Sequence, residues 1–246
     1  MDQETKHGVI ERKKEIPIIR LLVVPHRSND LTVSYPAFGT NDFRTNIEEM
    51  QKSYSHPVTG KGISFREPTT SESISAAAYD FGNLAKPQIF DPRWLQLGFI
   101  VRTAEGVFAN PPKNSERNPV TDEKTLKSML NNAKKENGIW LLPNDFGFAP
   151  YETFQQGVQD CDSFTESGLA RLLEHTEEKA AGSLREIASP KFYKRGINVF
   201  GFDSVKEPVL RVAGLASGRG LGDDGLDVVG YDFVDGGGGL AFGVLE

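Results

Sequence analysis

The chain has 246 residues, of which 34 are acidic and 28 are basic, and its formal net charge is -6. An acidic chain gains little from neutralising phosphates, so nucleic acid is not an expected partner. The single cysteine, Cys161, rules out an intramolecular disulfide and a cysteine cage for zinc. No signal-peptide pattern is visible, and the apolar run 16–25 is interrupted by Pro17 and Arg20 and is too short for a membrane span. We therefore expect a soluble protein that forms one domain over residues 1–246.

The first third of the chain predicts one strand and two helices. The β-branched run 18–24 predicts a buried strand. Residues 41–54 predict a helix capped by the Asn-Asp pair at its start, because apolar residues recur there at helical spacing. The pattern Thr69-x-x-Glu72 is a capping box, and it predicts the start of a second helix.

Further helices and short strands are predicted downstream. Helices are expected after Thr121 or Asp122, after the capping-box pattern Ser163-x-x-Glu166, and over 177–188. Strands are expected at 97–102 and 107–109 (a hairpin), 139–142, 197–200, 209–213 and 240–245. Helices and strands in this irregular order predict an α+β fold rather than a βαβ alternation.

Residues 220–225 match the dinucleotide pattern Gly-x-Gly-x-x-Gly. In a nucleotide-binding unit this loop must open a helix, whose N-terminal amides hold the pyrophosphate. The residues that follow, Leu226-Asp227-Val228-Val229, are typical of a strand instead. The match therefore argues only weakly for a nucleotide.

For the other candidate residues, a structural role is better supported than a catalytic or metal-binding one. Cys161 and His175 could form a nucleophile and base, but nothing in the sequence brings them together. Trp94 and Trp140 lie beside strand-like residues, and we expect them to pack in the core. The tail aspartates could bind calcium, although no EF-hand or nonapeptide repeat is present.

Residues 211–245 differ sharply from the rest of the chain. Eleven of the 25 glycines lie here, and the segment uses only Arg, Val, Ala, Gly, Leu, Ser, Asp, Tyr and Phe. Lys and Glu are abundant upstream but absent here, as are Gln, Met and Trp. Such a segment could simply close the fold. Glycine-dense loops lose much backbone entropy and bury little, however, so a long one indicates contact with another molecule.

The segment resembles the variable region of target proteins of diversity-generating retroelements, of the archaeal type. In that family template adenines are mutated, and positions derived from AAC codons cannot become Lys, Glu, Gln, Met or Trp. The closing residues 241–244 are similar to the family's terminal strand, and residues 90–98 are also similar to the archaeal proteins. The resemblance implies a C-type lectin fold with several helices, small antiparallel sheets and long irregular loops. It also implies a ligand-binding surface within 211–245 and no enzymatic activity.

The expected contact residues all belong to this tail: Ser217, Arg219, Asp223, Asp224, Asp227, Val229, Tyr231, Asp232, Phe233, Asp235 and Leu240. Tyr231 and Phe233 are expected to be the apolar anchors of the surface. A second set is expected to point inward: Val212, Ala213, Leu226, Val228, Phe242 and Val244.

The expected ligand is a protein or a cell-surface molecule, with no cofactor and no bound metal. Display of the chain on a cell or virion surface is left open. Two alternatives also stay open: calcium-dependent, lectin-like binding by the aspartates, and an enzyme that uses a nucleotide or the Cys161 thiol.

Overall fold

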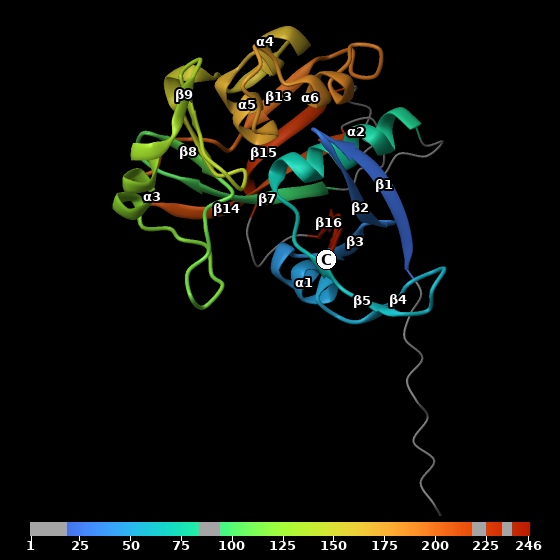
Figure 1. Cartoon of the computed structure of the whole chain (residues 1–246). Helices are drawn as coiled ribbons and strands as arrows, with labels where there is room; N and C mark the ends of the chain where they lie inside the picture. Colours follow the sequence, from blue (N-terminus) through green and yellow to red (C-terminus); the bar gives the residue numbers. More distant parts are fainter. Residues whose placement is uncertain (1–18, 84–93, 218–224, 233–237) are drawn as a thin grey trace, which may run out of the picture.

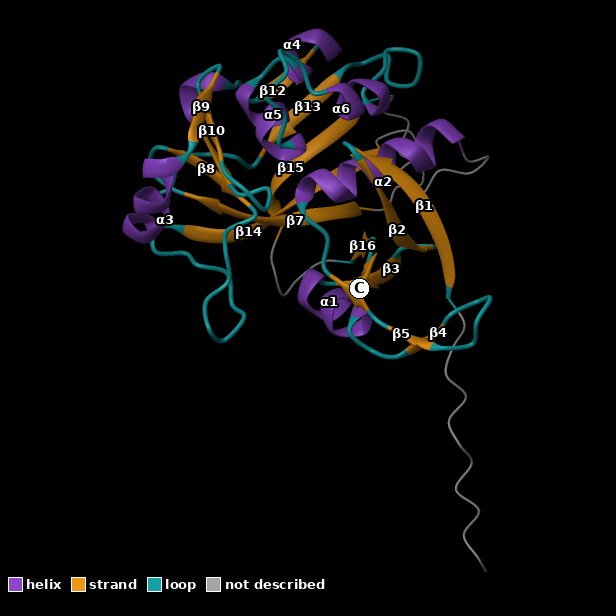
Figure 2. Ribbon diagram, viewed as in Figure 1, coloured by secondary structure: helices purple, strands orange, loops and turns teal. Residues whose placement is uncertain are grey.

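The computed structural model describes residues 19–83, 94–217, 225–232 and 238–246 (Figure 1). Within them, helices and strands alternate irregularly, which confirms the predicted α+β class. The described strands form sheets of four, eleven and two strands (Figure 2). None of the helices in these ranges is both long and apolar enough to cross a membrane.

The four-stranded sheet joins both ends of the described chain. Its order is β1 (Arg20–His26), β2 (Asn29–Tyr35), β17 (Val244–Leu245) and β6 (Phe65–Arg66). The prediction that the first strand is buried is wrong, because β1 lies at the edge of this sheet and pairs with β2 alone. Its side chains therefore alternate: Val24 is fully buried, whereas Val23 is 54% exposed.

The eleven-stranded sheet forms the centre of the molecule. Its order is β12 (Gly157–Gln159), β13 (Ile197–Phe200), β15 (Leu226–Asp232), β14 (Val209–Ser217), β7 (Trp94–Arg102), β8 (Gly106–Ala109), β11 (Gly147–Pro150), β10 (Ile139–Leu141) and β9 (Lys134–Glu136). In addition, β16 (Gly239–Ala241) pairs with β7 and with β3 (Phe38–Asn41). Most pairs are antiparallel, but β13 runs parallel to β15 and β16 runs parallel to β7.

The α-helices of the described ranges are α1 (Phe43–Met50), α2 (Thr70–Asn83), α3 (Glu123–Met129), α4 (Cys161–Thr165), α5 (Gly168–Glu174) and α6 (Gly182–Ile187). Short 3-10 helices cover Leu130–Asn132 and Tyr151–Thr153, and β4 (Tyr54–Ser55) pairs with β5 (Gly62–Ile63). The predicted capping box is confirmed: the Thr69 amide donates to Glu72 Oε2 at 2.8 Å, and the Glu72 amide donates to Thr69 Oγ1 at 3.3 Å. Asp42 caps α1 by accepting from the Thr45 amide at 2.8 Å.

The second predicted capping box, at Ser163, is wrong. Asp160 caps α4 instead, and Ser167 starts a separate helix by accepting from the Ala170 amide at 3.2 Å. The stretch 177–188 is helical only over α6. Its first amides are bound by Glu174, whose carboxylate accepts from the amide of Ser183 at 3.1 Å and from the next amide at 3.0 Å. A partner from a different helix cannot be read from local sequence spacing.

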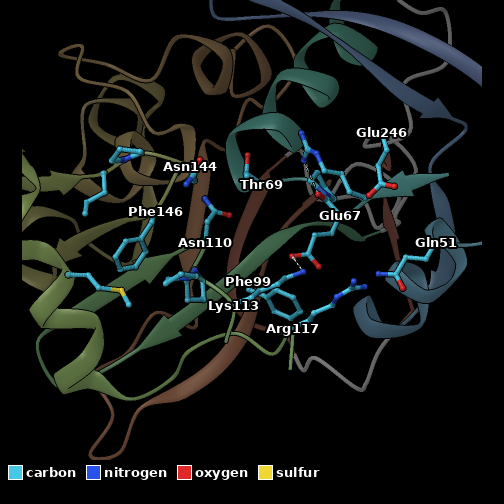
Figure 3. A pocket seen from close by; sticks show the side chains of 17 residues that line it. Gln51, Glu67, Thr69, Phe99, Asn110, Lys113, Arg117, Asn144, Phe146 and Glu246 are labelled. Carbon is cyan, nitrogen blue, oxygen red and sulfur yellow. Dashed lines mark hydrogen bonds and ion pairs between the residues drawn. The ribbon is translucent and has the colours of Figure 1, made fainter. Parts of the chain in front are cut away.

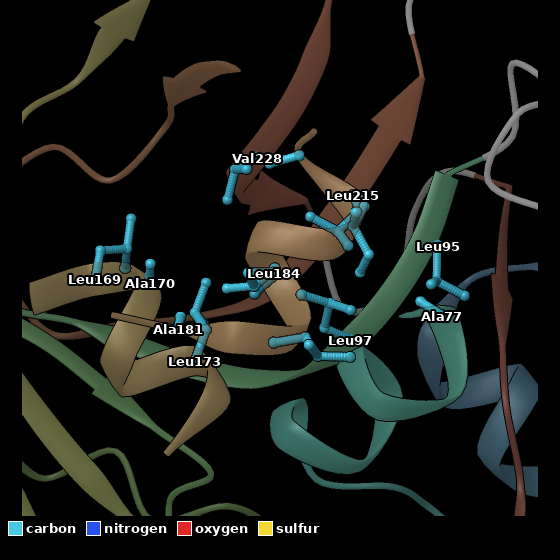
Figure 4. Close-up of a cluster of buried hydrophobic side chains, with 14 of the residues drawn as sticks. Ala77, Leu95, Leu97, Leu169, Ala170, Leu173, Ala181, Leu184, Leu215 and Val228 are labelled. Carbon is cyan, nitrogen blue, oxygen red and sulfur yellow. The ribbon is translucent and has the colours of Figure 1, made fainter. Parts of the chain in front are cut away.

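The main core lies between the large sheet and the helices α2, α5 and α6 (Figure 4). Leu95, Leu97, Leu215 and Val228 supply the sheet side of this core. Each such side chain stabilises the fold by roughly 1.5–3 kcal/mol when it is fully buried. The core therefore fixes β7, β14 and β15, the strands to which the predicted ligand-binding tail is attached.

The two tryptophans are only half-buried; Trp140 packs against the buried cluster that contains Phe108 and Phe148, but at its margin rather than inside it. Trp140 packs against Phe148 with ring centroids 5.7 Å apart, and the ammonium group of Lys135 lies 4.4 Å from its ring. A tryptophan in this position contacts a cation on the neighbouring strand β9, which its large π surface favours.

Candidate functional site

The two tail segments that lie outside the described residues are flanked by paired strands of the large sheet. β14 pairs with β7 on one side and with β15 on the other. Segment 218–224 therefore begins and ends at two neighbouring strands, and segment 233–237 runs from β15 to β16. The ends of both segments are thus positioned by paired backbone.

The predicted contact residues fall into three groups. Arg219, Asp223, Asp224, Phe233 and Asp235 lie outside the described residues. Tyr231 and Asp232 belong to β15, but their side chains also lie outside the description. The remaining four, Ser217, Asp227, Val229 and Leu240, are described.

Exposure is wrongly predicted for three of these four. Ser217 is 3% exposed, Val229 is 0% exposed and Leu240 is 5% exposed. These side chains are buried because both faces of the sheet are covered: Val212 and Ala213 point to opposite faces of β14, and both are fully buried. Ser217, Val229 and Leu240 therefore stabilise the frame and are removed from the contact surface.

The residues expected to point inward do so. Val212, Ala213, Leu226, Val228, Phe242 and Val244 are all at most 4% exposed. The apolar end of the tail is nevertheless two strands rather than one, because β16 belongs to the large sheet and β17 to the small one. At the crossing, Gly243 bonds Ser34 twice at 2.9 Å, through its carbonyl oxygen to the Ser34 amide and through its amide to the hydroxyl.

Three tail glycines are required by packing. A Cβ at Gly230 would lie 2.5 Å from the ring of Phe202, and one at Gly239 would lie 2.5 Å from the side chain of Gln96. A Cβ at Gly243 would meet two aromatic side chains at 2.8 Å. Carbon atoms do not approach so closely, so these positions exclude any larger residue. Composition alone does not distinguish these three glycines from the other glycines of the tail.

Asp227 is the one described contact residue that stays accessible. Asn198 Nδ2 donates to its Oδ1 at 3.0 Å, which fixes the carboxylate beside the start of β15. Together with Arg195, Gly225 and Val158, which is 74% exposed, it lines a hollow of about 290 Å³. This small hollow lies where segment 218–224 rejoins the sheet.

A larger cavity of about 830 Å³ lies elsewhere, and sequence reasoning missed it (Figure 3). Its walls come from the end of α1, the start of α2, the loop 110–119 and the β10–β11 turn. Aromatic and aliphatic residues line one part, and charged or amide side chains line the other. Only tertiary packing brings the loop 110–119 next to α1 and α2.

A buried polar network fixes the start of α2. The carboxylate of Asp145 accepts hydrogen bonds from Ser71 Oγ at 2.6 Å and Thr69 Oγ1 at 2.5 Å, and it pairs with Arg27 at 2.7 Å. Burial tends to raise the pKa of Asp145, but these hydrogen bonds and the Arg27 charge outweigh it and hold the pKa below its ordinary value. His175 Nδ1 lies 3.5 Å from the same carboxylate.

Backbone strain gathers at this network. Arg27, Asn110, Asp145 and His175 all have positive φ angles, between 51° and 62°. Asn110 Nδ2 donates to the Asp145 carbonyl oxygen at 2.9 Å, so all four residues belong to one connected cluster. Left-handed conformations cost energy for residues other than glycine. The contacts of this network hold four such residues in that conformation near the start of α2.

Cys161 and His175 do not form a nucleophile and base in this structure. Cys161 Sγ contacts the carbonyl oxygen of Arg185 at 3.9 Å, and burial raises the pKa of its thiol. His175 belongs to the Asp145 network, and burial lowers its pKa. Gly225 is followed by strand β15 rather than by a helix, so the Gly-x-Gly-x-x-Gly match lacks its required context.

Among the described residues, no group of three or more His, Cys, Asp or Glu side chains could hold a metal ion. Three tail aspartates, Asp223, Asp224 and Asp235, lie outside those residues. Calcium binding by the tail therefore remains an alternative.

Comparison with known proteins gives one structural likeness. No family model matches the chain, and no curated protein matches it. A solved structure described as "Accommodation of massive sequence variation in Nanoarchaeota by the C-type lectin fold" is similar, with a TM-score of 0.48 and 17% sequence identity. The match covers 86% of this chain and 99% of the other.

Proposed function

We propose that this chain is a non-enzymatic ligand-binding protein with a C-type lectin-like fold, and that its contact surface is carried by segments 218–224 and 233–237. The contact residues are Arg219, Asp223, Asp224, Asp227, Tyr231, Asp232, Phe233 and Asp235. The proposal extends to the origin of the surface, which is diversified by a retroelement. The ligand is a protein or a cell-surface molecule.

The observation that carries the proposal is the contrast between the two parts of the tail. Every residue expected to face inward is buried in the frame, whereas the glycine- and aspartate-rich residues are gathered in two segments between buried strands. A rigid sheet that holds both ends of a polar loop reduces the entropy lost when the loop binds. Binding residues are commonly carried by loops on such a scaffold.

The glycines refine which positions can vary. Gly230, Gly239 and Gly243 are fixed by close approach to neighbouring side chains, so mutation there would disrupt the frame. Gly238 is exposed, and a Cβ would meet its nearest atom at 3.6 Å. Variation is therefore expected to stop between Gly238 and Gly239.

A library experiment tests the proposal. Codons for Arg219, Asp223, Asp224, Phe233 and Asp235 are randomised, and the fraction of folded, protease-resistant chains is measured on a display platform. A matched library randomises the frame positions Ser217, Val229 and Leu240. We expect most members of the first library to fold and few members of the second, because large substitutions in a packed core cost roughly 2–5 kcal/mol.

Binding is tested with the same first library. Selection against an unrelated folded protein should enrich binders whose substitutions lie at the five randomised positions. If these positions tolerate substitution no better than the frame positions, the segments are structural and the proposal is wrong. The retroelement origin has its own test: the adjacent DNA should hold a near-copy of the coding sequence for 211–245 that differs at adenines.

A further inference from the structure

The 830 Å³ cavity is a second site, separate from the tail segments. It is lined by Gln51 after α1, by residues 66–69 before α2, by the loop 110–119 and by the β10–β11 turn, together with Phe99, Met129 and Glu246. A volume of this size suits a small organic ligand. None of its lining residues belongs to the predicted contact set.

One part of the cavity is an apolar wall. Phe99 and Phe146 are 9% and 5% exposed, and they are joined by the half-buried side chains of Met129, Leu142 and Pro112. Phe146 stacks on Phe108 at 6.0 Å, which holds its ring in place from behind. This wall is therefore preformed and can cover an aromatic or branched aliphatic group.

The other part of the cavity carries charge. Arg66 is engaged by Glu72, with two hydrogen bonds of 2.6 and 2.8 Å, and Lys113 pairs with Glu67 at 2.7 Å. Arg117 differs: its side chain is exposed, and within the described residues its guanidinium forms no hydrogen bond and no ion pair, although it lines the same cavity. In Figure 3, Arg117 and Gln51 lie at one end of the cavity and Phe146 lies at the other.

The loop that carries Arg117 is held by its own hydrogen bonds. Asn114 Oδ1 accepts from the amides of Glu116 at 3.0 Å and Asn118 at 2.9 Å, and the Arg117 amide donates to the Asn114 carbonyl oxygen at 2.9 Å. The φ angle of Arg117 is 64°, in the left-handed region. A built turn therefore presents a guanidinium whose five donors are available to an anion.

We propose that this cavity binds a small carboxylate that bears an apolar group, with the carboxylate on Arg117 and the apolar group against the apolar wall that includes Phe99. The planar guanidinium matches a carboxylate with two parallel hydrogen bonds. The side chains of Glu67, Glu246 and the Glu72 that binds Arg66 balance the three cations of the lining, so an added anion is not opposed by excess negative charge.

The experiment uses the full chain and three probes. N-acetyl-L-phenylalanine carries both features, N-acetyl-glycine lacks the apolar group, and the amide of N-acetyl-L-phenylalanine lacks the charge. Each is titrated while backbone amide shifts are followed by NMR. We expect saturable shifts at Phe99 and Lys113 with the first probe, and binding about fivefold weaker or more with either of the others.

The variant Arg117→Gln should weaken N-acetyl-L-phenylalanine about fivefold and leave the amide probe unchanged. Lys191→Gln, which removes an exposed cation outside the cavity, is the matched control and should change neither. Equal binding of both probes by the natural chain, or equal affinity in Arg117→Gln, would overturn the proposal. Absence of saturable shifts with all three probes would overturn it as well. Because no tail residue is altered, the outcome is independent of the proposed tail surface.

Discussion

Replacing Gly239 by alanine should destabilise the protein strongly, whereas the same change at Gly238 should not. Gly239 lies in β16, and an added Cβ would come within 2.5–2.6 Å of three atoms of the Gln96 side chain. Gln96 is fully buried and its Oε1 accepts from Asn46 Nδ2 at 2.7 Å. Asn46 Nδ2 also donates to the Gly239 carbonyl oxygen at 3.0 Å, so one methyl group would disturb the whole contact.

The magnitude follows from two contributions. Inserting a carbon into a packed region costs about 1–3 kcal/mol. Displacing Gln96 leaves a buried amide without its partner, which costs about 1–3 kcal/mol more. We expect the free energy of unfolding to fall by about 2–4 kcal/mol, since partial relaxation of Gln96 relieves some of the overlap. For Gly238→Ala the nearest contact is 3.6 Å, and the change should lie within about 1 kcal/mol of zero or be slightly stabilising.

Urea denaturation followed by far-ultraviolet circular dichroism measures both variants against the natural chain. The double variant Gly239→Ala, Gln96→Ala separates the two contributions, because it removes the clash and should recover part of the loss. Equal stability of the two glycine variants would show that Gly239 belongs to the tolerant part of the tail. That outcome would refute the proposed boundary between frame and contact segments.

Three other results are expected. Asp145→Asn should lower stability at neutral pH by about 1–3 kcal/mol. The folded pKa of Asp145 lies below its ordinary 3.8, so the carboxylate stabilises the fold above that value and stops doing so as pH falls through the folded pKa. The difference in unfolding free energy between the natural chain and Asp145→Asn should therefore shrink in acid. A difference that stays constant with pH would contradict this. Val229→Ala should cost about 0.5–3 kcal/mol, whereas Asp227→Ala should cost much less and instead alter ligand binding; equal losses in chemical denaturation would argue against the division of the tail. Calcium should leave the thermal midpoint unchanged, and a rise that chelation reverses would favour the calcium-dependent alternative.

The capping residues show what could be predicted locally. Asp42 and the Thr69–Glu72 box lie within three residues of the amides they bind, so the sequence places them directly. The start of α6 could not be predicted in the same way, because its amides are bound by Glu174 from α5. Such a partner depends on how two helices pack.

Burial of the tail shows the same division. The prediction that Val212, Leu226 and Val228 point inward is confirmed. The prediction that Val229 and Ser217 are exposed is wrong, because one face of a strand meets solvent only when that face is left uncovered. In this fold both faces of the sheet are covered at β14, since the successive residues Val212 and Ala213 are fully buried in different apolar clusters.

By itself, the sequence determined the α+β class, the positions of most helices and of about half of the described strands, and the unusual composition of residues 211–245, since these depend on local chemistry and spacing. Only the tertiary structure decided which tail glycines are fixed, because Gln96 and Phe202 are distant in sequence from Gly239 and Gly230. It also decided the position of the Arg117 cavity and the Asp145 network, each assembled from separate segments. Contacts between distant segments depend on the packing of the whole chain, and no periodicity along the sequence encodes them.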